Sequence, residues 1–139
     1  MDLPEPFIKR MKGELKEKFP AFLRCYEEPP VRGVRANLLK CPAEEFARLA
    51  PFTLGETVPW AEGGFYIGEE RPGAYLEHFA GLYYCQEPSA MCAAPLLQVQ
   101  PKERVLDLCA APGGKTTQLA AAMAGEGVLI ANEIGRAHV

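Results

Sequence analysis

Apolar and polar positions alternate in Val105-Leu-Asp-Leu-Cys109, which is typical of a short buried strand. The Ala-Pro-Gly-Gly sequence at 111–114 predicts a tight turn, and the segment Lys115–Met123 predicts a helix. A strand that turns through glycines into a helix leaves backbone N–H groups unpaired where the helix begins. These N–H groups predict a cradle for the polar end of a nucleotide-like ligand.

The chain before this turn predicts a small α+β module. Apolar side chains recur at i, i+4 from Phe7 to Phe19, so an amphipathic helix is expected over Pro4–Phe19, with Pro20 ending it. The other expected elements are a strand over 31–39, a helix over 42–49, extended pieces at 58–60 and 64–67, a strand over 82–86 and a largely buried helix over 88–98.

A second buried strand is expected over Val128–Glu133, after the turn Gly125-Glu-Gly127. Two strands joined by a helix predict the start of a Rossmann-like α/β domain. The pattern of apolar and polar residues changes near residue 80, and this change separates the two parts. We therefore expect an N-terminal α+β module over 1–80 and the beginning of the α/β domain over 81–133.

Composition narrows the class of protein without naming a function. The 139 residues carry a formal charge of −3, and the five cysteines never occur as Cys-x-x-Cys, which disfavours a zinc site or a disulfide framework. No apolar run is long enough to span a membrane, and the N-terminus does not resemble a signal peptide. We expect reduced thiols, a cytoplasmic protein, no metal and no membrane partner.

Charge is unevenly distributed, with nine Lys and Arg against six Asp and Glu in residues 1–40 and six against twelve in the rest. A mildly basic front half suits a polyanion, although a solvated helix face explains the excess as well. The strand expected over 31–39 carries a polar and basic set suited to phosphate contact, or to an ordinary half-exposed strand. The members of this set are Arg32, Arg35, Asn37 and Lys40.

Three interpretations compete for the glycine turn. A P-loop requires G-x-x-x-x-G-K-[ST], and Cys109 stands where its first glycine belongs, which disfavours an NTPase. A dinucleotide fold requires G-x-G-x-x-G, which is absent. Glu133 follows Gly113 by 20 residues, the spacing at which an acidic residue on the second strand binds ribose hydroxyls. A ribose-binding carboxylate without a phosphate site favours an adenosyl ligand such as S-adenosylmethionine.

Three segments together resemble the NOL1/NOP2/Sun family of RNA cytosine-5 methyltransferases. They are Asp107-Leu-Cys-Ala-Ala-Pro-Gly-Gly-Lys-Thr116, Tyr84-Cys-Gln-Glu-Pro-Ser-Ala-Met91 and Ala131-Asn-Glu133. The upstream segments Pro29–Lys40, Val58-Pro-Trp60 and Gly64-Phe-Tyr66 resemble its bacterial branch, which modifies ribosomal RNA. The resemblance runs from about residue 3 to residue 133 and implies an S-adenosylmethionine-dependent methyltransferase domain.

By this resemblance, the cofactor is S-adenosyl-L-methionine and the partner is RNA, most specifically ribosomal RNA, with the N-terminal module positioning the RNA. The cofactor-binding residues implied are Cys109, Ala110, Ala111, Pro112, Gly113, Gly114, Lys115 and Glu133. The remaining alternatives are a non-catalytic RNA-binding protein with a vestigial cofactor turn and, more distantly, a P-loop ATPase.

In enzymes of this family a cysteine thiolate adds to C6 of the target cytosine, which makes C5 nucleophilic. A second cysteine assists release of the methylated base. These cysteines lie in Thr-Cys and Pro-Cys motifs, and neither dipeptide occurs here. We therefore assign no catalytic residue, expect the nucleophile beyond the end of the chain and expect the chain alone to be inactive. Residues 134–139 match the translation of a common sequencing-adapter string, and we interpret them as a non-native tail.

Overall fold

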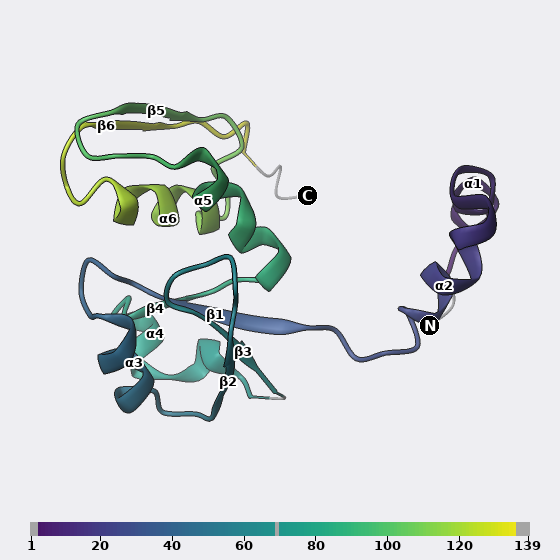
Figure 1. The fold of residues 1–139 in the computed structure, drawn as a ribbon, viewed down its shortest axis with the longest axis horizontal. Helices are drawn as coiled ribbons and strands as arrows, with labels where there is room; N and C mark the ends of the chain where they lie inside the picture. The colour runs from purple at the N-terminus through teal and green to yellow at the C-terminus, as the bar shows by residue number, and fades with distance from the viewer. Residues whose placement is uncertain (1–2, 69, 136–139) are drawn as a thin grey trace. The chain divides into compact units, whose positions relative to one another are not determined.

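The computed structural model describes residues 3–68 and 70–135. Contacts divide the chain into two compact units, Met1–Pro30 and Val31–Val139 (Figure 1). The tail interpretation therefore lies mostly outside the described residues, because only positions 134 and 135 are within them. The glycine turn at 111–114 and the four-stranded sheet that precedes it in sequence belong to the second unit.

The first unit is helical. Helix α1 spans Glu5–Leu15, a short 3₁₀ helix η1 spans Lys16–Lys18, and α2 spans Phe19–Arg24. Aromatic rings from both helices pack together, with Phe22 lying 6.2 Å from Phe7 and 5.2 Å from Tyr26 between ring centroids. The prediction that Pro20 ends the helix is wrong. Pro20 lies in the first turn of α2. The N–H groups of a first turn have no acceptor within the helix, so a proline there costs no hydrogen bond.

The second unit begins with a four-stranded antiparallel sheet in the order β2-β3-β1-β4. Its strands are β1 (Arg32–Ala36), β2 (Leu54–Thr57), β3 (Gly64–Ile67) and β4 (Tyr83–Cys85). Helix α3 (Ala43–Leu49) packs on one face, where Phe46 contacts the rings of Phe65 and Tyr83. The short helices η2 (Pro72–Ala74) and α4 (Leu76–Phe79) connect β3 to β4. This packing forms the main hydrophobic core.

Two details of this sheet differ from the sequence prediction. The extended piece expected at 58–60 is a turn, and the strand lies earlier, at Leu54–Thr57. Residues 33–36 are buried on both faces of β1 and do not alternate in exposure. The reason is that α3 covers one face while the 3₁₀ helix η3 (Pro88–Cys92) and helix α6 (Gly114–Ala122) cover the other.

The helix expected over 88–98 is divided into η3 and α5 (Ala93–Leu97), and it is not largely buried, since Leu96 is 79% and Leu97 64% exposed. Pro95 explains the division. In a continuous α-helix the carbonyl of Met91 would accept the N–H of residue 95, and proline has none. The Met91 carbonyl instead accepts the side-chain amide of Gln118 at 2.9 Å.

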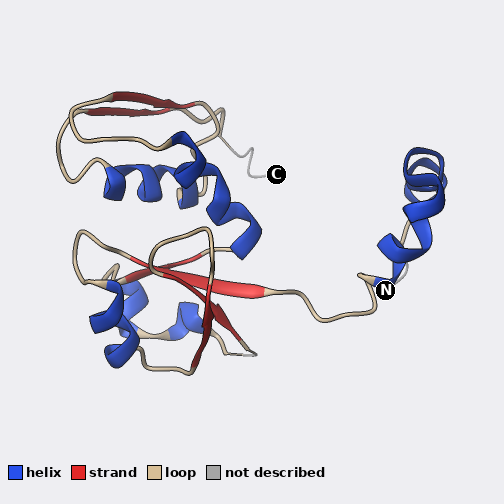
Figure 2. Ribbon diagram, viewed as in Figure 1, coloured by secondary structure: helices blue, strands red, loops and turns tan. Residues whose placement is uncertain are grey.

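Residues 104–131 form a parallel β-α-β unit. Strand β5 (Arg104–Asp107) pairs with β6 (Val128–Ala131), and α6 (Gly114–Ala122) connects them. Helices α5 and α6 lie on the side of this pair that faces the four-stranded sheet (Figure 2). The start of a Rossmann-like α/β fold is therefore confirmed. The boundary near residue 80 stays a prediction, and the pairing of β4 with β1 bears on it.

Candidate cofactor site

The glycine turn lies where β5 ends and α6 begins. Asp107 is the last residue of β5, and Gly113 caps the helix with φ of 112°, a backbone conformation that side chains disfavour. The peptide bond before Pro112 is cis. Within the described part of the chain, the N–H groups of Gly113 and Gly114 donate no hydrogen bond. The start of α6 therefore presents two free donors, as the sequence predicted.

Asp107 shapes the turn from inside. The residue is 8% exposed, and its Oδ1 accepts the N–H of Cys109 at 3.0 Å while its Oδ2 accepts a hydrogen bond from the Thr116 hydroxyl at 2.6 Å. The aspartate thereby joins the two ends of the turn. No role for Asp107 was predicted from the sequence, although an Asp at the end of a strand and a Thr in the first turn of a helix are a recognisable signal.

Glu133 lies beside the turn, as its spacing predicted. Oε2 accepts the N–H of Ala111 at 3.0 Å, and Oε1 accepts the N–H of Ile134 at 2.9 Å. The backbone of Ala110 also bonds to the carbonyl of Asn132 at 3.1 Å, which continues the parallel pairing past β5. The carboxylate is exposed, so its remaining lone pairs face solvent and suit a ribose diol.

The residues present fit an adenosyl ligand. An exposed carboxylate, two free N–H donors and two glycines without Cβ atoms meet at one edge of the β5–β6 pair. Cys109 is exposed, and it borders a hollow of about 220 Å³ together with Lys115 and Leu108. The roles of Cys109, Ala110, Ala111, Pro112, Gly113, Gly114, Lys115 and Glu133 as cofactor ligands remain predictions.

The four-stranded sheet supports the turn from its other side. The Tyr84 hydroxyl donates to the Pro112 carbonyl at 2.8 Å, and a Cβ at Gly114 would lie 3.2 Å from the amide of Gln86. Arg35 donates to the Gly114 carbonyl at 3.1 Å. The support that Tyr84, Gln86 and Arg35 give to the turn could not be predicted, because contacts across about 30 to 80 residues leave no local sequence pattern.

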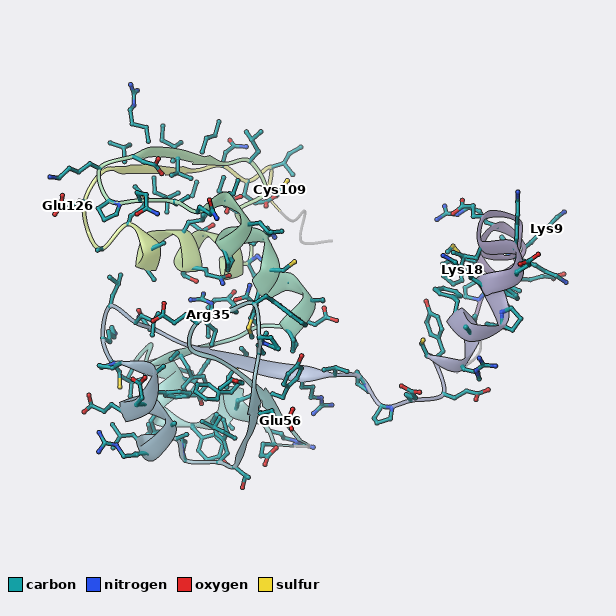
Figure 3. All side chains as sticks on the ribbon, viewed as in Figure 1. Lys9, Lys18, Arg35, Glu56, Cys109 and Glu126 are labelled. Carbon is teal, nitrogen blue, oxygen red and sulfur yellow. The ribbon has the colours of Figure 1, made fainter. Side chains whose placement is uncertain are left out.

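The polar set predicted for RNA contact is not a single surface. Arg35 is only 3% exposed and lies between the four-stranded sheet and α6 (Figure 3), so its assignment to phosphate contact is corrected. Asn37 donates to the Gly81 carbonyl at 2.9 Å, and Lys40 donates to the carbonyl of Ala80. Arg32 is exposed at the start of β1. RNA contact by Arg32, Asn37 and Lys40 stays a prediction.

The cysteines differ in environment. Burial raises the pKa of the Cys41 thiol, with Glu45 adding to the effect, and burial raises the pKa of the Cys85 thiol. Both thiols are therefore poorly suited to form a nucleophilic thiolate. Among the described residues, no group of His, Cys, Asp and Glu side chains is arranged to hold a metal ion. In the same residues, no helix has the length and apolarity needed to cross a membrane.

Comparison with known proteins identifies the family. Residues 3–88 match the family described as the N-terminal domain of 16S rRNA methyltransferase RsmF, and residues 94–139 match the family 16S rRNA methyltransferase RsmB/F. A solved structure titled a methyltransferase homolog protein from Pyrococcus horikoshii superposes with a TM-score of 0.74 at 34% identity, covering 83% of this chain and 39% of that one.

Curated relatives point to the same group of proteins. The ribosomal RNA small subunit methyltransferase F of Enterobacter sp. (strain 638) is 39% identical, and that of Escherichia coli O157:H7 is 38% identical. Each match covers 98% of this chain, which spans 31% of the length of either relative. The resemblance to the bacterial rRNA branch is confirmed. The chain belongs to the RsmF family of 16S rRNA methyltransferases.

Proposed function

We propose that this chain is the N-terminal portion of an enzyme that methylates C5 of a cytosine in ribosomal RNA, using S-adenosylmethionine. The observation that carries the proposal is the meeting of Glu133 with the glycine turn at the carboxyl edge of β5 and β6. That edge is where parallel α/β folds bind their ligands. Membership in an rRNA methyltransferase family supports the RNA substrate.

In this proposal Glu133 binds the ribose hydroxyls, and the N–H groups of Gly113 and Gly114 donate to the polar atoms of the methionine part. Cys109 and Lys115 line the hollow of about 220 Å³ beside the proposed position of the methionine part. The bound cofactor supplies an electrophilic methyl group on a sulfonium. Asp107 holds the turn open by bonding to both of its ends, so the donors keep their direction while the ligand enters.

The nucleophile of the reaction is not assigned to this chain. None of the five cysteines follows a threonine or a proline, which are the contexts that the family resemblance implies for the two reacting thiols. Cys41 and Cys85 are further disfavoured by their raised pKa. We therefore propose that the 139-residue chain alone does not methylate RNA. Because ribosomal RNA is the proposed substrate, the proposed compartment is the cytoplasm.

The test uses the full-length enzyme that carries this sequence. It is incubated with labelled S-adenosylmethionine and 16S rRNA, both free and in small subunits, and bisulfite sequencing maps any 5-methylcytosine. We expect transfer to cytosine by the full-length enzyme and none by the 139-residue chain. RNA binding without cofactor binding would instead support a non-catalytic RNA-binding protein, and methylation by the short chain would contradict the assignment of the nucleophile.

A further inference from the structure

We propose that Arg35 and Thr117 are positioning residues through which the four-stranded sheet sets the direction of the N–H donors in the glycine turn. The inference rests on the proposed function, since the donors matter only if the turn binds the cofactor. It adds to that function a cofactor site whose geometry depends on the N-terminal module.

Arg35 reaches the turn from the centre of the four-stranded sheet. Its Nε donates to Oε1 of Gln86 at 2.9 Å, and its Nη2 donates to the Gly114 carbonyl at 3.1 Å and to Oγ1 of Thr117 at 2.8 Å. Gln86 is itself held, because its amide donates to the Ala90 carbonyl at 3.2 Å. One guanidinium therefore joins β1, the segment after β4 and the first turn of α6.

The hydroxyl of Thr117 links Arg35 to the glycine turn. Its Oγ1 lies 2.8 Å from the carbonyl oxygen of Gly113 and 2.8 Å from Arg35. Arg35 has only donors, so the hydroxyl accepts from Arg35 and keeps its single proton for a carbonyl. The Gly113 carbonyl is nearer than that of Gly114, which lies 3.3 Å away, and it also accepts the backbone N–H of Thr117 at 2.9 Å. Donation from a charged guanidinium strengthens the second bond, because hydrogen bonds in a chain polarise one another.

Three successive carbonyls of the turn are thereby held, two by the sheet and one by α6. Tyr84 holds the Pro112 carbonyl, Thr117 holds that of Gly113, and Arg35 holds that of Gly114. In a planar trans peptide the N–H of the next residue points opposite to the carbonyl. Holding the Pro112 and Gly114 carbonyls towards the sheet therefore directs the N–H groups of residues 113 and 115 away from it, and the bond from Thr117 fixes the peptide that carries the N–H of Gly114.

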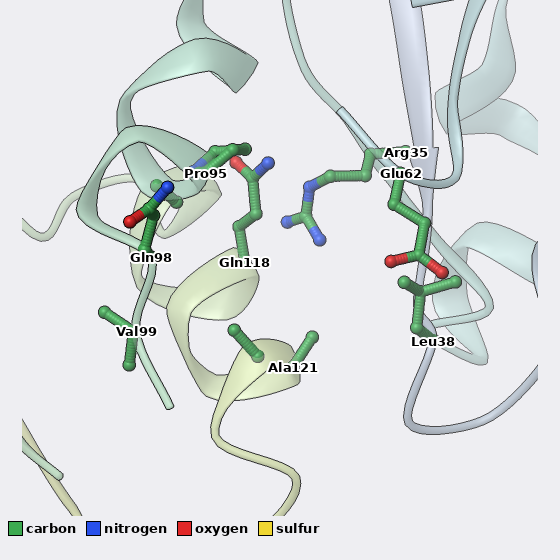
Figure 4. A pocket seen from close by; sticks show the side chains of 10 residues that line it. Arg35, Leu38, Glu62, Pro95, Gln98, Val99, Gln118 and Ala121 are labelled. Carbon is green, nitrogen blue, oxygen red and sulfur yellow. The ribbon is translucent and has the colours of Figure 1, made fainter. Parts of the chain in front are cut away.

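Packing does not explain why an arginine occupies this position. A cavity of about 400 Å³ lies beside Arg35, lined also by Gln118 and Ala94, and the guanidinium points across it towards Gln118 (Figure 4). Among the described residues Arg35 forms no ion pair, and burial lowers the pKa of its guanidinium to about 10. A buried charge without a carboxylate is costly, so a group that only filled space would be apolar.

The test measures cofactor affinity in the full-length enzyme by titration calorimetry with S-adenosylhomocysteine. Thr117→Val removes the hydroxyl at nearly constant side-chain volume. Arg35→Met removes the guanidinium but keeps a flexible, unbranched side chain. We expect each change to weaken binding about tenfold, and the double variant to be only slightly weaker than either single one. Such non-additivity identifies two residues that act through one connection.

Two kinds of control separate positioning from a general loss of structure. Thr53→Val and Arg48→Met change exposed residues of the same types outside the site, and they should leave affinity unchanged. Thr117→Ser restores the hydroxyl and should bind within twofold of the unchanged enzyme. In steady-state assays, Thr117→Val should raise KM for S-adenosylmethionine without raising KM for RNA.

The outcomes distinguish this inference from the proposed function. If the unchanged enzyme binds no S-adenosylhomocysteine, the proposed function fails and this inference fails with it. If the unchanged enzyme binds and both single variants bind equally well, only the positioning role is overturned. Additive losses in the double variant, or weak binding by Thr117→Ser with a lowered melting temperature, would also overturn it, because they indicate a merely structural role.

Discussion

Oε2 of Glu133 accepts the backbone N–H of Ala111 across 22 residues of sequence, at 3.0 Å. The end of β6 is thereby tied to the turn that follows β5. Each carboxylate oxygen can accept more than one hydrogen bond, so this contact leaves capacity for ribose hydroxyls. Glu133 thus has two tasks, one towards its own chain and one towards the proposed ligand.

Replacing Glu133 with glutamine should weaken cofactor binding more than it weakens the fold. The amide oxygen that Glu133→Gln introduces can still accept one N–H, but the charge that strengthens bonds to the ribose is lost. Hydrogen bonds to charged groups contribute about 1.5–3 kcal/mol, so affinity should fall about tenfold or more. Calorimetry with S-adenosylhomocysteine measures it. Glu126→Gln, at an exposed ion pair, should have no effect, and equal affinity in both variants would contradict the ribose assignment.

Gly127→Ala should strongly destabilise the β5–β6 pair. Gly127 has φ of 104°, and an added Cβ would collide with the Glu103 carbonyl oxygen, which also accepts the N–H of Val128. We expect a loss of about 2 kcal/mol or more in the free energy of unfolding, measured by urea denaturation. Gly125→Ala is the matched control, because φ is 79° there and no atom lies within 4 Å. Equal losses at the two positions would mean that the close approach at Gly127 is unimportant.

Alkylation at neutral pH should separate the cysteines. Cys25 and Cys109 are exposed, whereas Cys41 is buried, and burial raises the pKa of Cys41 and Cys85. Because the thiolate is the reacting form, we expect iodoacetamide to modify Cys25 and Cys109 about tenfold faster or more, as measured by a peptide mass-spectrometry time course. In the full-length enzyme, S-adenosylhomocysteine should protect Cys109 and leave Cys25 unprotected. Protection of neither thiol would argue against Cys109 lining the cofactor site.

Alkaline pH should destabilise the second unit through Tyr83. Burial, assisted by Cys85, Glu77 and Tyr75, raises the pKa of Tyr83 from 10 to about 12. The folded state therefore favours the neutral phenol. Its contribution to stability is complete below pH 10 and is lost as the pH rises towards 12.

The free energy of unfolding should accordingly fall more steeply between pH 10 and pH 12 in the unchanged chain than in Tyr83→Phe. A tyrosinate absorbance titration checks the assignment, because the step near pH 12 should vanish in Tyr83→Phe and persist in Tyr26→Phe, where the ring is exposed. Identical pH profiles for the unchanged chain and Tyr83→Phe would show that Tyr83 is not the responsible group.

The sequence predicted elements whose cause is local. The strand-turn-helix around Gly113 and a second strand before Glu133 follow from apolar alternation and glycine spacing, and the structure contains both, although β6 ends at Ala131. The prediction that these two strands are buried is wrong, since Leu106 is 57% and Ile130 is 56% exposed. The break between η3 and α5 was missed, although its cause, Pro95, is also local. The run of small apolar residues predicted one continuous helix, and the effect of Pro95, which has no N–H, was not considered.

What could not be predicted depends on contacts between distant segments. The burial of Arg35 follows from η3 and α6 covering a sheet face that a strand pattern alone presents as exposed. Asp107 accepts a hydrogen bond from Thr116, and Tyr84 donates one to the Pro112 carbonyl. Neither contact can be predicted without the three-dimensional form of the turn. A basic residue on a strand was therefore assigned to RNA although it bonds within the protein.

The two adjacent threonines at the start of α6 bond in opposite directions, Thr116 to the carboxylate of β5 and Thr117 to the guanidinium of β1. Adding or deleting one residue between Cys109 and Lys115 would rotate the helix by about 100° relative to both partners. Both hydroxyls would then lose their partners in a single step. The length of this loop is thus constrained as strictly as its glycines, and substitutions at its other positions should be tolerated far more readily than insertions or deletions.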